Sequence, residues 1–485
     1  MHVKKIAILS LIIVSFWLFP FCAASRTISP IDYGLMGAKN GIERYYILLK
    51  CHQDAGKYGH ISYRGIEKIE LEIPSDAQSI PLPICTDFSG VTITVKNTMK
   101  SLVLFEMAET LTVINGISGE DIDKGCYDNY DAIKNGSYLL VVEDLNPWIN
   151  NRKGYNYGVN RRDVFFLKDA KAYNKPICSY NTVYSTPKVS YCEVNTERKT
   201  IKNIKFIRDD ESTEKTFLFG IRNQVNIDLS HIELITPPSD KMYGDAAIQI
   251  SNCVKVVMGD IYINGTYSQK NKFGYGVSLG NIYDLKVKRM NAHAEWGVFG
   301  NNYLSNVELM DCKINRFDIH CYGRNFKASN CIFEELYNQF SSIYGIVRFD
   351  KCTFTNFVPI LVESSFNAYT PFDLVWNRCT FNLSKKKNYL ITLFGVPGQY
   401  NDRAELRRKC LPNITLKNCK VNLTKDVDSW YLIKTDGNKY KDTFDYISNV
   451  CLQNIKVNGG SKETFNFSTE ELTTTNPLKI ILDIK

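Results

Sequence analysis

An apolar pattern of eight positions recurs nine times between residues 227 and 457, and it constrains the fold more than any other feature of the chain. The first, third, sixth and eighth positions are apolar in every copy. Each copy consists of two short strands of period two, separated by a two-residue break that is often polar, as at Ser329-Asn330 and Lys417-Asn418. The apolar quartets are Ile227, Leu229, Ile232 and Leu234; Val256, Met258, Ile261 and Ile263; Leu285, Val287, Met290 and Ala292; Val307, Leu309, Cys312 and Ile314; Phe326, Ala328, Cys331 and Phe333; Val347, Phe349, Cys352 and Phe354; Leu374, Trp376, Cys379 and Phe381; Ile414, Leu416, Cys419 and Val421; and Val450, Leu452, Ile455 and Val457.

Copies of this kind cannot bury their apolar faces alone, so we expect them to stack and share one continuous interior. The copies that begin at residues 307, 326, 347 and 374 follow one another at intervals of 19, 21 and 27 residues. A strand, a tight bend and a second strand, repeated at such intervals, are typical of a parallel β-solenoid. At about 4.8 Å per coil, nine rungs would extend over roughly 40 Å.

Five cysteines occupy the sixth position of the repeat, where isoleucine or methionine stands in the other copies. This column is therefore expected to be an internal stack of small apolar side chains. No CxxC pair or Cys/His ligand spacing accompanies it, which argues against a metal site or disulfides. Any disulfide is expected among the cysteines before the repeats. Cys178 and Cys192 could close a loop, but the sequence does not determine the pairing. These cysteines are Cys51, Cys85, Cys126, Cys178 and Cys192.

The N-terminus has the layout of a cleaved secretory signal. A basic start, MHVKK, precedes the apolar run IAILSLIIVSFWLFPF and the small-residue exit CAAS, so we expect cleavage near Ala24. A membrane anchor is the competing interpretation, but no basic stop-transfer cluster follows the run. Lipidation of Cys22 is a further alternative, which the bulky Pro20 and Phe21 disfavour. The mature protein is expected to be secreted or periplasmic, without a stable membrane span, and a surface lipoprotein is the alternative.

The opening of the mature chain contains Asp32-Tyr33-Gly34, a predicted helix over residues 41–53, a glycine exit and a first strand that ends at Pro74. One face of this helix carries Ile42, Tyr45, Tyr46 and Leu49. With the two-strand units and their tight, often Asn-containing bends, this opening resembles the right-handed parallel β-helix of the pectate-lyase-like superfamily, which includes pectate lyases, polygalacturonases and phage tailspikes. The resemblance implies an all-β fold in which the helix caps the open N-terminal end of the solenoid.

We expect five segments along the chain. Residues 1–24 form the signal peptide, 25–105 the N-terminal cap and first β-helix strands, 106–200 an irregular aromatic and basic excursion beside the early coils, 201–460 the parallel β-helix coils, and 461–485 a C-terminal closing segment. In the excursion, Trp148, Arg152 and Tyr155 are side chains of the kind that stack on sugar rings or bind acidic groups. A packed cap is an equally open alternative for this stretch.

In the superfamily that the chain resembles, ligands lie along the sheet formed by the third strand of each coil. In the candidate third strand FDIHC, alternation places Phe317, Ile319 and Cys321 inside and turns Asp318 and His320 towards solvent. Two side chains that point the same way can act on one bound group, although a satisfied surface pair is the alternative for any single residue. The candidate catalytic residues are Asp318, His320, Arg316, His293 and Glu295, and the candidate substrate-binding residues on this face are Arg324, Trp296, Tyr337 and Gln339.

A lyase is one mechanism that fits these residues. His320 or His293 would remove the proton at C5 of a uronate, while Arg316 or Arg324 would neutralise the carboxylate and stabilise the enolate-like charge. The net charge of +8 suits an acidic polysaccharide, although charge alone does not choose among polysaccharide, nucleic acid and membrane. We expect a polysaccharide partner, no nucleic acid and no cofactor. Calcium is an alternative that the resemblance allows, but no cluster of acidic residues on successive coils matches such a site, so no metal ligands are assigned.

A hydrolase is the second mechanism, with Asp318 and either Glu295 or Glu335 as a pair of carboxylates. The polygalacturonase pattern of Asn-Thr-Asp, Asp-Asp and Gly-His-Gly is absent, because the only adjacent Asp pair, Asp209-Asp210, precedes the first clear coil. A third interpretation is a non-catalytic glycan-binding or adhesive rod, since a fold does not imply a function. The sequence leaves the polysaccharide, the chemistry and the oligomeric state open.

Overall fold

The computed structural model describes residues 27–146, 160–183, 185–209, 214, 216–236, 247–265, 275–294, 297–335, 337–356, 358–363, 372–394, 412–435, 449–459, 464–469 and 479–485. The helices among them are α2 (Gly41–Ala55), α3 (Gly119–Lys124) and three 3-10 helices, η1 (Pro30–Tyr33), η2 (Leu35–Gly37) and η3 (Asp131–Ile133). Every other regular element is a strand, and the strands form three sheets. The protein is therefore all-β in class, as the repeat predicts.

The largest sheet has 23 strands, and each turn of the chain adds parallel strands beside those of the turn before. Its strands are β1 (Thr27–Ile28), β2 (His60–Ser62), β3 (Lys68–Ile73), β4 (Ile80–Pro81), β5 (Cys85–Thr98), β6 (Leu102–Ala108), β12 (Lys199–Arg208), β13 (Thr216–Thr236), β14 (Ile248–Gly265), β15 (Tyr275–Lys288), β16 (Asn291–Ala294), β17 (Gly297–Met310), β18 (Lys313–Ile314), β20 (Gly323–Ser329), β21 (Ile332–Glu335), β23 (Ile343–Asp350), β24 (Thr353–Asn356), β26 (Phe372–Asn377), β27 (Thr380–Leu383), β29 (Asn413–Lys417), β30 (Lys420–Leu423), β32 (Asn449–Asn458) and β34 (Lys479–Ile484).

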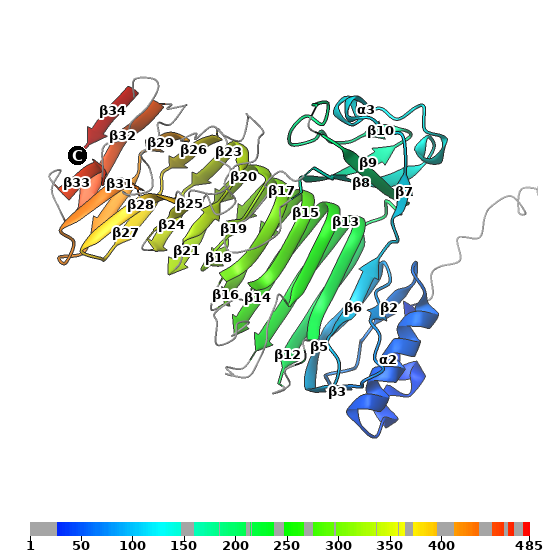
Figure 1. Cartoon of the computed structure of the whole chain (residues 1–485). Helices are drawn as coiled ribbons and strands as arrows, with labels where there is room; N and C mark the ends of the chain where they lie inside the picture. The colour runs from blue at the N-terminus through cyan, green and yellow to red at the C-terminus, as the bar shows by residue number, and fades with distance from the viewer. Residues whose placement is uncertain are drawn as a thin grey trace, which may run out of the picture.

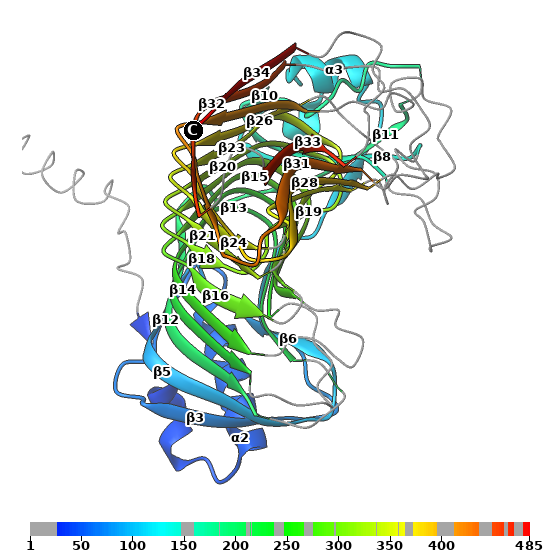
Figure 2. The same cartoon turned by 90° about the vertical axis from the view of Figure 1, so that its left-hand side faces the viewer.

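A second parallel sheet of six strands closes the later coils. Its strands are β19 (Asp318–Ile319), β22 (Asn338–Phe340), β25 (Ile360–Glu363), β28 (Lys387–Phe394), β31 (Ser429–Thr435) and β33 (Phe465–Ser468). The coils stack along one axis, from α2 at the N-terminal end to β33 and β34 at the other (Figure 1). In the view turned by 90°, the strands of successive coils lie one behind another (Figure 2). This architecture is the right-handed parallel β-helix.

The repeat has the register that the sequence predicts. Ile227 pairs with Val256, Val256 pairs with Leu285, and the same row ends with Ile414 opposite Val450. Every residue of the nine quartets is buried in one continuous core, except Val457, which packs against it partly buried. The column of cysteines belongs to this core as well. All thirteen cysteines in the described part of the chain are free thiols, so Cys178 and Cys192 do not close a loop.

The break inside each repeat is a left-handed bend. In all nine copies the second residue of the break has a φ between 50° and 55°. These residues are His231, Asp260, Arg289, Asp311, Asn330, Lys351, Arg378, Asn418 and Asn454. Apart from glycine, asparagine and aspartate tolerate this conformation best, and their side chains can form hydrogen bonds to one another from coil to coil. Asn454 Nδ2, for example, donates to Asn418 Oδ1 at 2.8 Å.

Helix α2 caps the solenoid, as the resemblance implies, and packs against β3 and β4. Asn40 caps its N-terminus by accepting a hydrogen bond from the Glu43 N–H at 2.8 Å. The buried face differs from the expected one, because Leu48 and His52 replace Ile42 and Tyr46. Tyr46 lies on the solvent side, where its hydroxyl donates to Asp76 Oδ1 at 2.6 Å. The face is rotated because Leu48 enters the core of the solenoid with Tyr45 and Leu49, and His52 contacts Pro81 and Tyr63.

His52 is a neutral histidine in this interface, and it predicts an acid-sensitive cap. Its Nδ1 lies 2.7 Å from the Pro81 carbonyl and its Nε2 lies 2.8 Å from the Tyr63 hydroxyl. Burial lowers the pKa of His52 from 6.5 to about 4, against the opposite effect of the Pro81 carbonyl. Between these values the unfolded chain binds a proton that the folded protein excludes. The free energy of unfolding is therefore expected to be highest above pH 6.5 and to fall by up to about 3 kcal/mol towards pH 4.

Urea denaturation between about pH 7 and about pH 4.5 measures this dependence. A His52→Gln variant is the control, because glutamine keeps a donor and an acceptor but does not titrate in this range. Subtracting the two profiles removes the contribution of all other groups. If the variant retained the slope of the wild type, the acid sensitivity would belong to another residue.

The stretch expected to be an irregular excursion contains a five-stranded antiparallel sheet. Its strands are β7 (Thr112–Ile114), β8 (Ser137–Asp144), β9 (Arg162–Lys168), β10 (Lys171–Ala172) and β11 (Pro187–Glu193), in the order β10-β9-β8-β11-β7. The chain leaves the solenoid after β6 and re-enters it at β12, and the inserted sheet lies beside the early coils (Figure 1). Leu139 and Val164 pack against Val225 and Val254 of the coils. The eight-position template does not detect this insertion, because antiparallel strands follow a different spacing.

Candidate functional site

The six-stranded sheet begins at the predicted strand FDIHC. Phe317 and Ile319 point into the core, as alternation predicts. Phe317 bridges to Phe299 on the preceding coil, and Asp318 pairs with Gln339 on the following one. The strand is thus a regular rung of the solenoid, and it carries Asp318 on its outer side.

Cys321 does not enter the interior of the solenoid, which corrects the expectation from alternation. It is buried against Ile177 and Tyr322, in a cluster between the coil and the inserted sheet. Strand β19 ends at Ile319, and Tyr322 has a left-handed φ of 56°. The alternation of side chains therefore stops before Cys321.

Asp318 points away from the interior but is fully buried, at 0% exposed, and not turned to solvent as expected. The Arg316 guanidinium covers it, with Nε 2.8 Å from Oδ1 and 2.6 Å from Oδ2. The Gln339 N–H donates to Oδ1 at 3.2 Å, and the Tyr275 hydroxyl donates to Oδ2 at 3.1 Å. Strand alternation determines the direction of a side chain but not what lies over it, which is why the burial was not predicted.

The Asp318 carboxylate is held in its ionised form. Burial alone would raise its pKa, but the Arg316 guanidinium and the His320 ring outweigh burial and keep the pKa below its usual value. Burial would likewise lower the pKa of Arg316, and the carboxylate raises it instead. Arg316 is only 2% exposed. The pair is therefore a buried ion pair that orients its neighbours, and Arg316 is not presented to a ligand in solvent.

His320 is the member of this group that reaches solvent, with 17% of its side chain exposed. Its Nε2 lies 3.2 Å from Asp318 Oδ2 and 3.0 Å from the Tyr275 hydroxyl. An ionised carboxylate only accepts hydrogen bonds, so this arrangement favours the tautomer with its proton on Nε2 and its basic lone pair on Nδ1. A carboxylate, an imidazole and a phenol in mutual contact can move a proton to or from a bound group.

Tyr275 is the residue of this group that the sequence analysis missed. It begins β15, and its ring folds over Gly300 on β17. A Cβ placed on Gly300 would overlap that ring, and a Cβ on Gly297 would come within 2.8 Å of Arg316 Cδ. Glycines at positions 297 and 300 therefore make room for the two side chains that flank Asp318. They are the sequence signal from which the contact could have been inferred.

The other predicted binding residues of this face complete the group. The Arg316 guanidinium lies 4.4 Å from the centre of the Tyr337 ring, at cation–π distance. Arg316 Nη2 also lies 3.3 Å from Gln339 Oε1. The structure therefore brings Arg316, Asp318, His320, Tyr337 and Gln339 together, and we refer to these five residues with Tyr275 as the Asp318 cluster.

The remaining candidates lie elsewhere or outside the described residues. His293 is exposed on β16 of the large sheet, where it pairs with Asn264. Arg324 is exposed, and its Nη1 lies 3.4 Å from the Pro176 carbonyl of the insertion. The following candidates are outside the described residues: Glu295, Trp296, Trp148, Arg152 and Tyr155. Their roles, and that of the Glu335 side chain, remain predictions.

Further along the six-stranded sheet, two tyrosines and a lysine lie together. Tyr389 on β28 pairs with Tyr431 on β31, and their ring centres are 5.5 Å apart. Lys434 Nζ lies 4.9 Å from the centre of the Tyr389 ring. All three are partly exposed, so aromatic and cationic side chains continue on the sheet that carries Asp318.

Two features that would suggest other functions are absent from the described residues. In those stretches, no group of three or more His, Cys, Asp or Glu side chains is arranged to hold a metal ion. Nor does any helix of the same stretches have both the length and the apolar character needed to cross a membrane.

Comparisons with known proteins identify the fold. No protein-family model and no curated protein matches the sequence. Among solved structures, the tailspike Gp54 of Acinetobacter baumannii bacteriophage AP22, in complex with A. baumannii capsular saccharide, matches with a TM-score of 0.52 and 13% identity, over 91% of this chain and 76% of that one. The tailspike gp49 of Pseudomonas phage LKA1 matches with a TM-score of 0.50 and 11% identity, over 93% and 78%. At these identities the likeness concerns the fold, which is that of the β-helix tailspikes.

Proposed function

We propose that the protein binds an extended acidic polysaccharide along the six-stranded sheet and cleaves it by lyase chemistry at His320. The observation that carries this proposal is the contact of His320 Nε2 with a buried, ionised Asp318 and with the Tyr275 hydroxyl. The capsular saccharide bound to the tailspike of phage AP22 supports a polysaccharide as the class of ligand. We further propose that the chain is exported, on the strength of the signal-like residues 1–24.

The proposed reaction is a β-elimination at a uronate. His320 Nδ1 takes the proton from C5, the C4–C5 double bond forms, and the bond from C4 to the glycosidic oxygen breaks. The Tyr275 hydroxyl donates a proton to the departing oxygen. Asp318 stabilises the imidazolium that forms, because its ionised carboxylate accepts a hydrogen bond from Nε2–H. Arg316 is buried with Asp318, so of the two arginines considered for the substrate carboxylate we assign this role to Arg324, which is exposed on β20 of the large sheet.

The hydrolase mechanism fits these contacts less well. A glycosidase needs one carboxyl group that donates a proton and a second that attacks or activates water. Asp318 is fully buried and its pKa lies below the usual value, so it can neither touch the sugar nor hold a proton at neutral pH. Glu295 and the Glu335 side chain are outside the described residues. A hydrolase that uses them would release reducing ends without absorbance near 232 nm, which distinguishes it from a lyase.

A non-catalytic glycan-binding or adhesive protein is the alternative function. One argument for it is that Arg316 and Asp318 neutralise each other in a buried ion pair, so neither charge is available to a substrate. A second argument is the group of partly exposed side chains further along the same sheet, Tyr389, Tyr431 and Lys434. In that case the Asp318 cluster would only shape the binding face.

The test is to incubate the mature protein with uronate-containing and neutral polysaccharides while recording absorbance near 232 nm and reducing ends. We expect both signals on an acidic polysaccharide, and a loss of about 10²–10³-fold in kcat/KM for His320→Ala. Tyr275→Phe should lower kcat more than it raises KM, because the phenol acts on the leaving oxygen.

The control variant is His60→Ala, which removes a partly exposed histidine from β2 in the N-terminal part of the large sheet and should retain activity. Reducing ends without absorbance would replace the lyase by a hydrolase. Binding without cleavage on any polysaccharide would favour the adhesive alternative and exclude catalysis.

A further inference from the structure

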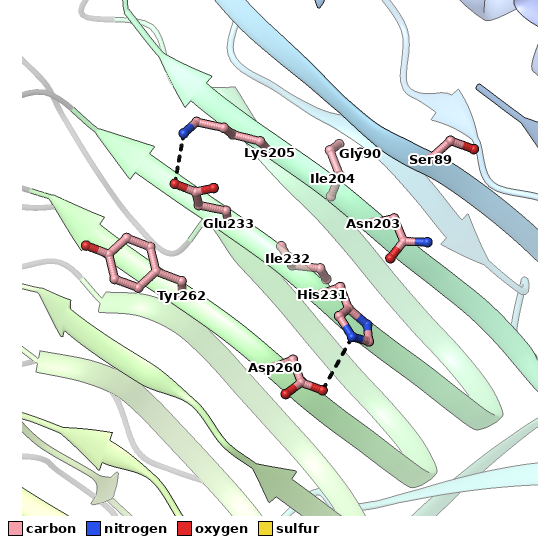
Figure 3. Close-up of a pocket in the computed structure, with 10 residues that line it drawn as sticks. All are labelled: Ser89, Gly90, Asn203, Ile204, Lys205, His231, Ile232, Glu233, Asp260 and Tyr262. Atoms are coloured by element: carbon pink, nitrogen blue, oxygen red, sulfur yellow. Dashed lines mark hydrogen bonds and ion pairs between the residues drawn. The ribbon is translucent and has the colours of Figure 1, made fainter. Parts of the chain in front are cut away.

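A groove of about 850 Å³ lies on the outer face of the large sheet, across β5, β12, β13 and β14 (Figure 3). None of its residues belongs to the Asp318 cluster, whose residues lie on later coils. We call it the corner groove and define it by Asn203, Lys205, His231, Glu233, Asp260 and Tyr262.

The corner groove follows from the left-handed bends of the early coils. Asn203, His231 and Asp260 have φ values of 64°, 54° and 53°, so three successive coils bend at the same place. Two residues beyond each bend, Lys205 pairs with Glu233, and Glu233 pairs with Tyr262. Side chains of successive coils therefore line a continuous trough. Because coils are about 4.8 Å apart, the trough spans roughly 14 Å, which is room for a short linear ligand.

The charges of the corner groove are paired, either with one another or with Arg289 beside it. Lys205 Nζ lies 2.9 Å from Glu233 Oε1. Asp260 accepts two hydrogen bonds from Arg289, at 2.6 and 2.7 Å, and its Oδ2 lies 3.7 Å from His231 Nε2. Two cations thus face two anions, and no surplus of positive charge is left to attract a polyanion. The paired groups still offer lone pairs and N–H groups for hydrogen bonds.

Tyr262 supplies the apolar surface of the groove. It is 39% exposed, and Figure 3 shows its ring near Glu233 of the neighbouring strand and directed away from Asp260. An aromatic ring with a polar tip beside Glu233, with Asn203 further along the groove, matches the two sides of a sugar, which has an apolar C–H face and a rim of hydroxyl groups.

We infer that the corner groove binds a short, uncharged stretch of oligosaccharide. The ring of Tyr262 stacks on one sugar, and Asn203, His231 and Glu233 hydrogen-bond its neighbours. This site is separate from the catalytic site proposed at the Asp318 cluster and does not require that the protein cleave its ligand. It would hold a polysaccharide chain on the early coils whether or not the later coils act on it.

Affinity electrophoresis through gels that contain dextran, mannan, galactan, polygalacturonate or alginate tests this inference. At least one neutral polysaccharide is expected to retard the protein, and the retardation should persist at about 0.5 M salt, where charge-driven binding is screened. Tyr262→Ala is expected to weaken this binding about tenfold, whereas Tyr262→Phe should keep most of it. Tyr58→Ala, which removes an exposed tyrosine near α2, is the matched control and should bind as the wild type does.

The outcomes separate this site from the catalytic proposal. Retention of neutral binding in His320→Ala supports two independent sites, even if that variant or the wild type cuts nothing. The inference is overturned if no neutral polysaccharide is retarded, or if Tyr262→Ala binds as tightly as Tyr58→Ala. Binding that is confined to the acidic polysaccharides and vanishes in salt would overturn it as well.

Discussion

Replacing Asp318 by asparagine is expected to lower the free energy of unfolding by about 3–5 kcal/mol, far more than its small change in shape would suggest. The substitution leaves the Arg316 guanidinium buried, at 2% exposed, without a counter-charge. It also replaces one acceptor oxygen by an NH2 donor. This is unfavourable because the Tyr275 hydroxyl and Arg316 both donate hydrogen bonds to the Asp318 carboxylate. Guanidinium denaturation followed by circular dichroism measures the loss.

Two further variants give this prediction its contrast. Asp350→Asn makes the same substitution in a pair that faces solvent, since its partner Arg378 is half exposed, and should cost no more than about 1 kcal/mol. Arg316→Met combined with Asp318→Leu removes both charges and should recover most of the stability while abolishing any activity. If Asp318→Asn were as mild as Asp350→Asn, water would have access to the ion pair and the proposed orientation of His320 would lose its basis.

The fold was predictable because its core repeats. Each quartet, such as Ile414, Leu416, Cys419 and Val421, must face inwards for its coil to stack, and one shared register satisfies all of them. The same argument identified the cysteine column as core, since Cys379 stands where Ile232 stands in another coil. The inserted antiparallel sheet was not predictable in this way, because it has a separate core around Leu140 and Phe165 and shares no register with the coils.

The sequence predicted the outward direction of the candidate side chains but not how far each of them is buried. Alternation along FDIHC places Asp318 and His320 on the outer face, where the structure has them. It does not reveal that Arg316 folds back over Asp318, because that contact depends on space left by Gly297. Tyr275 lies 43 residues from Asp318 in the chain, so only the stacking of coils brings them together. Local sequence thus predicted the face, and the tertiary packing decided which side chains reach solvent.

Replacing Trp376 by alanine is expected to destabilise the protein by about 3–5 kcal/mol, because it empties the largest side chain from a fully buried layer. Trp376 lies against Phe349 on one coil, with ring centres 6.2 Å apart, and against Phe381 on its own coil at 5.6 Å. Each coil contacts only its neighbours, so a cavity here weakens the coupling between the two parts of the rod. Limited proteolysis should then remove the coils after residue 372 before the earlier ones.

Trp376→Phe separates lost volume from lost hydrogen bonding. Within the described residues, Trp376 Nε1 is buried without a hydrogen-bond acceptor, so phenylalanine removes an unsatisfied N–H while it keeps most ring contacts. This variant should therefore lose much less stability than Trp376→Ala. Ile346→Ala, at an exposed position of the neighbouring strand β23, is the matched truncation and should leave the proteolysis pattern unchanged. Equal losses for Trp376→Phe and Trp376→Ala would mean that the indole N–H finds a partner in solution, and that the layer is held by polarity as well as by packing.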